Sequence, residues 1–275
     1  MKNTINRPDY HDYETIEDIP DHMLGWTVEP KLDGMWVTVV LKGTKGTLYS
    51  RTGRVKHTFD LPAKVRKTVL LGEYVVGTHW AKTSGLDGTL HLFDCLRMAG
   101  QACESLPLSD RRTLLQDAVL LSGLCQLDWV RAPYASAPIR WRASLRHHWA
   151  TTVARDGFEG LVLKDPTAPY GAPWVRIKAR TTEDYVVLGT CMGTGRNAGQ
   201  VSALRAGLWV AGALVEIGTV AGLTNKQRMA ITANPEGFIG KVFEASGMYR
   251  FPSGALRHPT FKCWREDKRP EECRI

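Results

Sequence analysis

Short runs of β-branched and aromatic residues recur along the chain, and this pattern limits the fold to one built mainly from strands. Between Trp26 and Met98 such runs are separated by Gly-containing or charged segments. The pattern predicts strands over 26–30, 35–41, 46–51, 69–76, 90–96, 158–164 and 173–178. The pair 35–41 and 46–51 is expected to form a hairpin about a Gly/Lys turn.

Two segments interrupt the strands with helical spacing. The stretch 109–121, S-D-R-R-T-L-L-Q-D-A-V-L-L, begins with a serine cap, carries an early acid and repeats its apolar residues at helical intervals. A second helix is expected across 142–155. Strands with these two helices indicate an α+β domain that ends near Arg180.

The pattern changes after Arg180. Short strands with Gly-rich turns follow, together with one short helix near 224–232, and this combination is typical of a small β-barrel. At 275 residues the chain is long enough for two domains. We therefore expect domains over 1–180 and 181–275, with a hinge at 181–184.

Composition narrows the class of protein. The apolar fraction of 43% and the charged fraction of 23% are those of a globular protein. No apolar run of membrane-spanning length and no signal peptide is visible, so a cytoplasmic location is expected. The six cysteines form no C-x-x-C pair, which argues against a structural zinc site. Residues 25–275 are strongly basic, and such a body attracts polyanions, nucleic acid first among them.

The segment E-P-K-L-D-G at 29–34 places Lys31 after a strand, beside an acid and a glycine. A lysine in such a sequence is usually a surface charge, but six further motifs follow it in order. They are S-R-T-G at 50–53, L-G-E at 71–73, F-D at 93–94, D-G-F-E-G-L-V-L-K at 156–164, W-V-R-I-K at 174–178 and W-R-E-D-K at 264–268.

Together these motifs resemble the covalent nucleotidyltransferase superfamily, which contains ATP-dependent DNA ligases, RNA ligases and mRNA capping enzymes. The resemblance spans residues 26–269, and L-R-H-P-T-F-K at 256–262 looks most like the small bacteriophage DNA ligases. It implies a nucleotidyltransferase (adenylation) domain of antiparallel sheets with flanking helices, followed by an OB-fold barrel. It also implies ATP and Mg²⁺ (or Mn²⁺) as cofactors, and a monomer that seals 5′-phosphate/3′-hydroxyl nicks in duplex DNA.

The resemblance assigns roles to individual residues. Lys31 is the nucleophile that becomes AMP-lysine, with Asp33, Arg176 and Lys178 beside it. The nucleotide is expected to contact Glu29 at the adenine amino group, Phe93 by stacking and Glu73 at the ribose. Glu159 and Asp33 are the expected metal ligands, and Arg51 the ligand of the 5′-phosphate at the nick. In the barrel, Arg265, Asp267 and Lys268 correspond to the motif that orients pyrophosphate.

Chemistry explains why cations should surround Lys31. An amine with a pKa of about 10.4 is neutral in roughly one molecule in a few thousand at pH 7, and only the neutral form attacks phosphorus. Nearby cations such as Arg176, Lys178 and a bound metal would lower the pKa of Lys31 and neutralise the phosphate.

Two positions depart from the family pattern. Trp36 stands where ligases usually carry arginine, so one contact must be lost or made elsewhere. Arg176 replaces a lysine in the R-I-K motif; it stays cationic but cannot accept a proton. Contacts to the duplex backbone are hypothesised for Arg196 in the loop G-T-G-R-N-A-G-Q and for Arg140, Arg142 and Arg146.

Three alternatives remain at this point. An RNA ligase would usually lack the barrel that carries W-R-E-D-K. A capping enzyme would use GTP, whereas Glu29 and the S-R-T-G arginine favour ATP and a nick. A catalytically dead nucleic-acid-binding module would be consistent with Trp36 and Arg176, but not with the intact Lys31.

Overall fold

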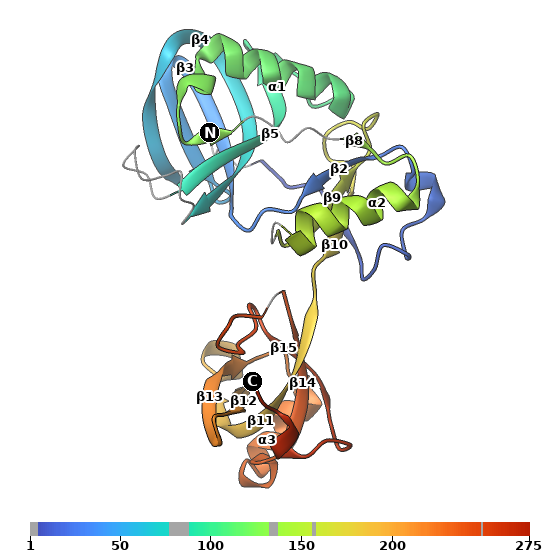
Figure 1. Cartoon of the computed structure of the whole chain (residues 1–275). Coiled ribbons are helices and arrows are strands. Elements are labelled where there is room, and N and C mark those ends of the chain that lie inside the picture. Colours follow the sequence, from blue (N-terminus) through green and yellow to red (C-terminus); the bar gives the residue numbers. More distant parts are fainter. Residues whose placement is uncertain (1–4, 77–87, 132–136, 156–157, 249) are drawn as a thin grey trace. The chain divides into compact units, whose positions relative to one another are not determined.

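The computed structural model describes residues 5–76, 88–131, 137–155, 158–248 and 250–275, which form two compact units (Figure 1). The first unit comprises Met1–Lys178 and the second Ala179–Ile275. The division falls two residues before the boundary expected from the sequence. None of the described helices is long and apolar enough to cross a membrane.

The first unit contains two sheets. One has the strand order β3-β4-β5-β6, with β7 alongside β5. Its members are β3 (Met35–Ser50), β4 (Val55–Val76), β5 (Gly88–Met98), β6 (Gln101–Ala102) and β7 (Val130–Arg131). The other has the order β1-β10-β9-β2-β8. Its members are β1 (Tyr10–Tyr13), β2 (Thr27–Pro30), β8 (Ala137–Pro138), β9 (Gly160–Lys164) and β10 (Trp174–Lys178).

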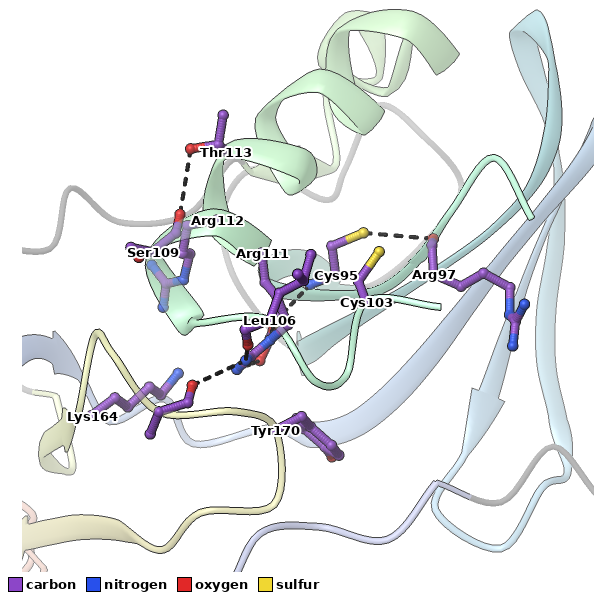
Figure 2. A network of polar contacts seen from close by, with 12 residues as sticks. Cys95, Arg97, Cys103, Leu106, Ser109, Arg111, Arg112, Thr113, Lys164 and Tyr170 are labelled. Carbon is purple, nitrogen blue, oxygen red and sulfur yellow. Dashed lines mark hydrogen bonds and ion pairs between the residues drawn. The ribbon is translucent and has the colours of Figure 1, made fainter. Parts of the chain in front are cut away.

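The predicted helix at 109–121 is present as α1 (Leu108–Ser122) and covers one face of the first sheet (Figure 1). It ends at Gly123, whose φ of 74° is the left-handed conformation that favours glycine. The side chain of Arg111 at the start of α1 is buried and donates to both carboxylate oxygens of Asp94 in β5, at 2.8 and 3.0 Å. It also donates to the carbonyl of Leu106 at 2.6 Å (Figure 2). Asp94, the acid of the F-D motif, therefore fastens the helix to the sheet.

The predicted helix at 142–155 is present as α2 (Arg142–His148), continued by a π-helical segment, η4 (Trp149–Arg155). Two short 3-10 helices, η1 (Asp21–Met23) and η3 (Leu124–Gln126), also lie in the described part of this unit, and a third, η5 (Gly195–Asn197), belongs to the second unit.

The hairpin expected about residues 42–45 is wrong. Strand β3 runs without a turn from Met35 to Ser50 and pairs throughout with β4, with register shifts around Gly43. The chain reverses at 51–54, where Ser50 N donates to Arg54 O at 2.8 Å. Glycine at 43 and 46 suggested a turn, but Gly46 lies beneath the ring of Phe59, which a Cβ would meet at 2.2 Å. Close packing, not reversal, is the reason for glycine at 46.

The two sheets meet through a small aromatic core. Trp36 and Leu71 from the first sheet pack with Val162 and Trp174 from the second, and all four are buried. The larger core lies on the other face of the first sheet, under α1. The boundary between the two sheets is where the candidate site forms.

The second unit has five antiparallel strands in the order β13-β12-β11-β14-β15. They are β11 (Thr181–Met192), β12 (Val201–Val210), β13 (Ala213–Val220), β14 (Val242–Gly247) and β15 (Thr260–Trp264). The two outer strands meet where Phe261 N donates to Ala221 O at 2.7 Å, which closes the sheet on itself at that point. Helix α3 (Asn225–Ala233) begins at a capping box of Thr224 and Gln227, and the short helices η6 (Glu236–Phe238) and η7 (Pro270–Glu272) follow.

Candidate active site

Lys31 is held where three strands converge. Beyond the last paired residue of β2, Lys31 N donates to Gly160 O at 2.8 Å and Glu159 N donates to Lys31 O at 3.2 Å. Gly160 has a φ of 149°, and a Cβ there would lie 2.0 Å from Ile177 O in β10. Only glycine fits this close approach. The consequence is an ion pair between the Lys31 ammonium and the Glu159 carboxylate.

An open pocket, with about 700 Å³ of empty space that includes open solvent, lies beside Lys31. Among the predicted site residues, five line it: Glu29, Lys31, Glu73, Phe93 and Arg176. They come from β2, β4, β5 and β10 and the segment after β2, so both sheets contribute. Four motifs distant in sequence therefore meet in one cavity.

The pKa of Lys31 is lowered. Burial is the largest cause, and the charges of Lys178 and Arg176 add to it, while Glu73 and Asp33 oppose it. The predicted effect of the cations is present, although removal from water contributes more. The amine is thus shifted toward the neutral form that a nucleophile needs.

The two cations opposite Lys31 share a carboxylate that sequence reasoning missed. Arg176 donates to both oxygens of Asp12, at 2.7 and 3.0 Å, and Lys178 donates to one of them at 2.9 Å. Asp12 lies in β1, which pairs in parallel with β10 and sets Asp12 beside Arg176. The strand Y-H-D-Y is short and polar, so no periodicity pointed to it.

The aromatic wall of the pocket explains why tryptophan occupies position 36. Its ring centroid lies 5.0 Å from that of Phe93 and 5.9 Å from that of Trp174. The guanidinium of Arg7 lies 4.6 Å from the Trp36 ring centroid, and Arg7 also lines the pocket. An N-terminal arginine therefore lies next to the position at which ligases usually carry one.

Glu29 belongs to a buried cluster of three charges. Lys164 donates to one of its carboxylate oxygens at 2.8 Å, and Arg112 from α1 forms an ion pair with the other. Figure 2 shows Arg112 and Lys164 on neighbouring elements. Burial alone would raise the pKa of Glu29, but the two cations hold it below its usual value. Burial lowers the pKa of Lys164 against the charge of Glu29.

Glu73 behaves differently. Burial raises its pKa to about 7, although Arg7 and Lys31 oppose the shift. Its strand partner across β3 is Trp36, and Gly34 approaches it so closely that a Cβ would lie 2.9 Å from Glu73 Cγ. The glycine of the K-L-D-G motif is thus required by its contact with β4.

The remaining predicted site residues do not line the pocket. Asp33 is exposed in the segment between β2 and β3, and Arg51 is exposed in the turn between β3 and β4. In the second unit, Arg196 is exposed in η5. Arg265 donates to Asp184 at 3.1 Å and to Asp267 at 2.8 Å, and Lys268 pairs with Asp184. Of the motif that contains Glu159, Asp156 and Gly157 lie outside the described residues.

The carboxylate near Lys31 suits a hard cation that takes its remaining ligands from the substrate. Within the described part of the chain no group of three His, Cys, Asp or Glu side chains could form an all-protein metal cage. Mg²⁺ commonly binds through one or two carboxylates together with nucleotide phosphates, and Glu159 offers such a carboxylate beside the pocket.

Comparisons with known proteins give the family. No protein-family model matches the chain. It is 28% identical over 323 residues to a DNA ligase of Archaeoglobus fulgidus, covering 94% of this chain and 55% of that protein. It is 33% identical over 215 residues to a probable DNA ligase of an Anaeromyxobacter species, covering 68% of this chain and 40% of that protein. The chain thus spans about half the length of the curated relatives it matches.

Solved structures show the same fold. A structure from a study of Lig E DNA ligases, described as DNA binding with a minimal scaffold, superposes with a TM-score of 0.66 at 18% identity, covering 95% of this chain and 100% of that one. The structure named Pmar-Lig_PreS3 gives 0.68 at 20% identity, covering 94% and 67%. Sequence and fold together thus place the chain in the family of the DNA ligases.

Proposed function

We propose that this chain seals nicks in duplex DNA with ATP as the adenylate donor. The observation that carries the proposal is Lys31: a partly buried amine of lowered pKa, beside an open pocket and two fixed cations. This arrangement suits attack on a phosphate more than it suits a structural lysine.

In the first step, neutral Lys31 Nζ attacks the α-phosphorus of ATP. A P–N bond forms, the P–O bond to pyrophosphate breaks, and Glu159 is the nearest base for the ammonium proton. Arg176 and Lys178 stabilise the charge on the phosphate oxygens. Bound Mg²⁺, held by Glu159 and the phosphates, would supply further charge neutralisation.

In the second step the 5′-phosphate of a nick attacks the lysyl-AMP phosphorus, which restores Lys31 and forms DNA-adenylate. In the third, the 3′-hydroxyl attacks the 5′-phosphorus and AMP leaves. Arg51 is proposed to contact the 5′-phosphate. Arg265 and Lys268, with Asp267, are proposed to orient pyrophosphate in the first step, and Arg196 to contact the duplex.

The nucleotide contacts follow from the pocket. Phe93 offers a ring face for a purine, and Glu73 a carboxyl group for the ribose hydroxyls. Glu29 is proposed to read the adenine amino group, for which each of its oxygens, though already engaged by Lys164 or Arg112, keeps a further lone pair. Arg7 is proposed to take the place of the arginine that Trp36 replaces.

Labelling tests the proposal. The chain is incubated with Mg²⁺ and α-labelled ATP or GTP, resolved under denaturing conditions and chased with nicked duplex. We expect label from ATP that is lost in Lys31→Ala, retained in the exposed-lysine control Lys226→Ala, and chased from the protein as the nick is sealed. Label from GTP would indicate a capping-type enzyme. Absence of label would leave only a binding module.

A further inference from the structure

Strand β1 places two side chains against a cation of the pocket. Tyr10 and Asp12 lie on one face of the strand, because side chains two residues apart point the same way. The parallel pairing of β1 with β10 sets Asp12 opposite Arg176. The guanidinium carbon of Arg176 lies 3.9 Å from the ring centroid of Tyr10, and both residues line the pocket. The N-terminal strand therefore contacts Arg176 through an aromatic ring and a carboxylate.

The Asp12 carboxylate joins the two cations of β10 into one unit. Its oxygens accept from Nε and Nη2 of Arg176 at 2.7 and 3.0 Å, and one of them also accepts from Lys178 Nζ at 2.9 Å. Burial alone would raise the pKa of Asp12, but the hydrogen bonds from Arg176 and Lys178 hold it below its usual value. The carboxylate is therefore ionised, and its bonds to both cations are charge-assisted.

Order in these two side chains matters for the reaction. Arginine and lysine lose much rotamer freedom when they are fixed, and a fixed charge stabilises a transition state best when its orientation is set beforehand. The bonds to Asp12 use Nε and Nη2 of Arg176 and leave other N–H groups of Arg176 and Lys178 for a phosphate. Asp12 can thus order both cations without occupying all their donors.

The same contact explains the residue type at position 176. A guanidinium matches both oxygens of a carboxylate, whereas an ammonium is a point charge that cannot do so. Arginine stands at 176 where the family pattern has lysine, and a carboxylate faces it from the neighbouring strand. Asp12 and Arg176 are therefore expected to act as a pair.

Strand β1 is itself well anchored in the first unit. Before the strand, Trp174 N donates to Asp9 O at 2.9 Å, and within it the ring of Tyr10 meets Trp174 edge-on with centroids 5.9 Å apart. After the strand, Arg142 of α2 donates to Asp21 at 2.6 Å. A strand held before and after Asp12 can carry a positioning group.

We propose that Asp12 is a positioning residue for lysyl-AMP formation, which holds Arg176 and Lys178 in the orientation in which they face the phosphates of ATP. The inference rests on the proposed function, and Asp12 acts through these cations instead of on the substrate. Because Asp12 is negative, its removal increases the net positive charge beside the pocket and should not weaken attraction of the triphosphate. Loss of Asp12 should therefore lower the rate of the reaction and not the affinity for ATP.

The test measures single-turnover lysyl-AMP formation by the full chain with Mg²⁺, over a range of ATP concentrations at one pH. In Asp12→Asn we expect the maximal rate to fall about tenfold, while the ATP concentration for half the maximal rate stays unchanged or falls. Asp12→Glu, which restores the carboxylate, should recover the rate to within about threefold of the unmodified chain. The control Asp21→Asn removes a carboxylate of the same segment that also pairs with an arginine, and it should change neither value.

A double-mutant cycle tests whether Asp12 acts through Arg176. Arg176→Lys should lower the maximal rate about fivefold in the unmodified chain, because the two-pronged contact is lost. In the Asp12→Asn chain the same substitution should cost less than about twofold, because no such contact remains to be lost. Independent losses at the two positions would overturn the proposal.

Three further outcomes would overturn it: an unchanged rate in Asp12→Asn, a raised half-saturating ATP concentration, or an equal loss in Asp21→Asn. A faster Asp12→Asn chain would also do so, since the carboxylate would then compete with phosphate for the cations. Urea unfolding of each variant checks folding, and Asp12→Glu replaces Asp12→Asn in the cycle if the latter does not fold. If the unmodified chain forms no lysyl-AMP, the proposed function fails and the inference with it, whereas normal labelling with an unaffected Asp12→Asn rejects the inference alone.

Discussion

Two clusters of charge in this protein use the same residue types to different effect. In the pocket cluster (Asp12, Lys31, Glu73, Glu159, Arg176 and Lys178) burial is the largest cause of the pKa shifts of Lys31 and Glu73. The barrel cluster (Asp184, Glu244, Arg265, Asp267 and Lys268) lies in the second unit, and its exposed member is Asp267.

In the barrel cluster hydrogen bonding is the largest cause of each shift. The hydrogen bond with Asp267 raises the pKa of Arg265, and it lowers the pKa of Asp267 to about 2. Arg265, Asp267 and Lys268 therefore stay charged at neutral pH. The comparison shows that burial makes the charge of a group adjustable, whereas hydrogen bonding between opposite charges fixes it. The first suits a nucleophile that must lose a proton, and the second suits a constant counter-charge for pyrophosphate.

The largest expected effect comes from removing the cations of the pocket cluster. Arg176→Met/Lys178→Met should slow lysyl-AMP formation at pH 7 by about 10²–10³-fold, because fixed positive charge stabilises the transition state. It should also move the pH profile of the single-turnover rate to higher pH, because both cations lower the pKa of Lys31. The exposed control Arg205→Met should leave both unchanged. A slower rate with an unmoved profile would restrict these cations to binding phosphate.

Loss of stability next separates the barrel cluster from the buried group of Glu29, Arg112 and Lys164. Glu29→Ala leaves Lys164 and Arg112 buried without their carboxylate, and we expect about 3 kcal/mol of destabilisation by urea unfolding. Asp267→Ala, at the exposed member of the barrel cluster, should produce no measurable change. Similar losses in the two variants would mean that the barrel cluster is as structural as the buried one.

Arg265→Ala tests whether the charge of Arg265 in the second unit contributes to lysyl-AMP formation and to no later step. The rate of lysyl-AMP formation should fall about 30-fold, because a charge-assisted contact to the leaving group is lost. The shape of the pH profile should not change. Sealing of a nick that already carries AMP at its 5′-phosphate should be retained. Equal loss in both assays would contradict a role confined to pyrophosphate.

Substitution of Arg7 tests whether the N-terminal segment contributes to the pocket. Arg7→Gln keeps hydrogen-bonding capacity but removes the charge, and we expect about a tenfold lower kcat/KM for lysyl-AMP formation. The companion Trp36→Phe should have a smaller effect, because it retains an aromatic face for Phe93 and Trp174. An unchanged Arg7→Gln enzyme would leave Arg7 a packing residue.

The smallest effect expected is a pH dependence of stability from Glu73. Its pKa is 4.5 in the absence of structure and about 7 in the folded chain, so the folded protein binds the additional proton between those values. This contribution is complete below pH 4.5 and is lost as the pH rises through 7. Glu73→Gln should therefore gain about 1–2 kcal/mol over the unmodified chain between pH 5 and pH 8. Parallel stability curves for the two proteins would contradict the shifted pKa.

The sequence predicted those elements whose indicating residues lie close together in the chain. Helix α1 was predictable because its early acid and apolar spacing lie within fifteen residues, but the predicted serine cap is wrong, because the helix begins at Leu108 after Pro107 and Ser109 lies inside it. Lys31 and Arg176 were predictable because ordered motifs carry them. The hairpin at 42–45 was wrong because Gly46 reflects contact with Phe59, a residue thirteen positions away. Asp12 could not be found, because its place beside Arg176 depends on the parallel pairing of β1 with β10, which no local pattern encodes. Arg7 could not be found either, because its contact with the ring of Trp36 joins residues far apart in the chain.

The position of β3 has a consequence for solubility. It is a sixteen-residue strand at the edge of its sheet, and a long uncapped edge is a template for pairing with another chain. Lys42 and Lys45 are exposed along it, and lysines on an edge strand oppose the approach of a second strand. Neutralising these two lysines should therefore promote aggregation, whereas changes at Lys56, Lys64 and Arg66 on the inner strand β4 leave that protection in place.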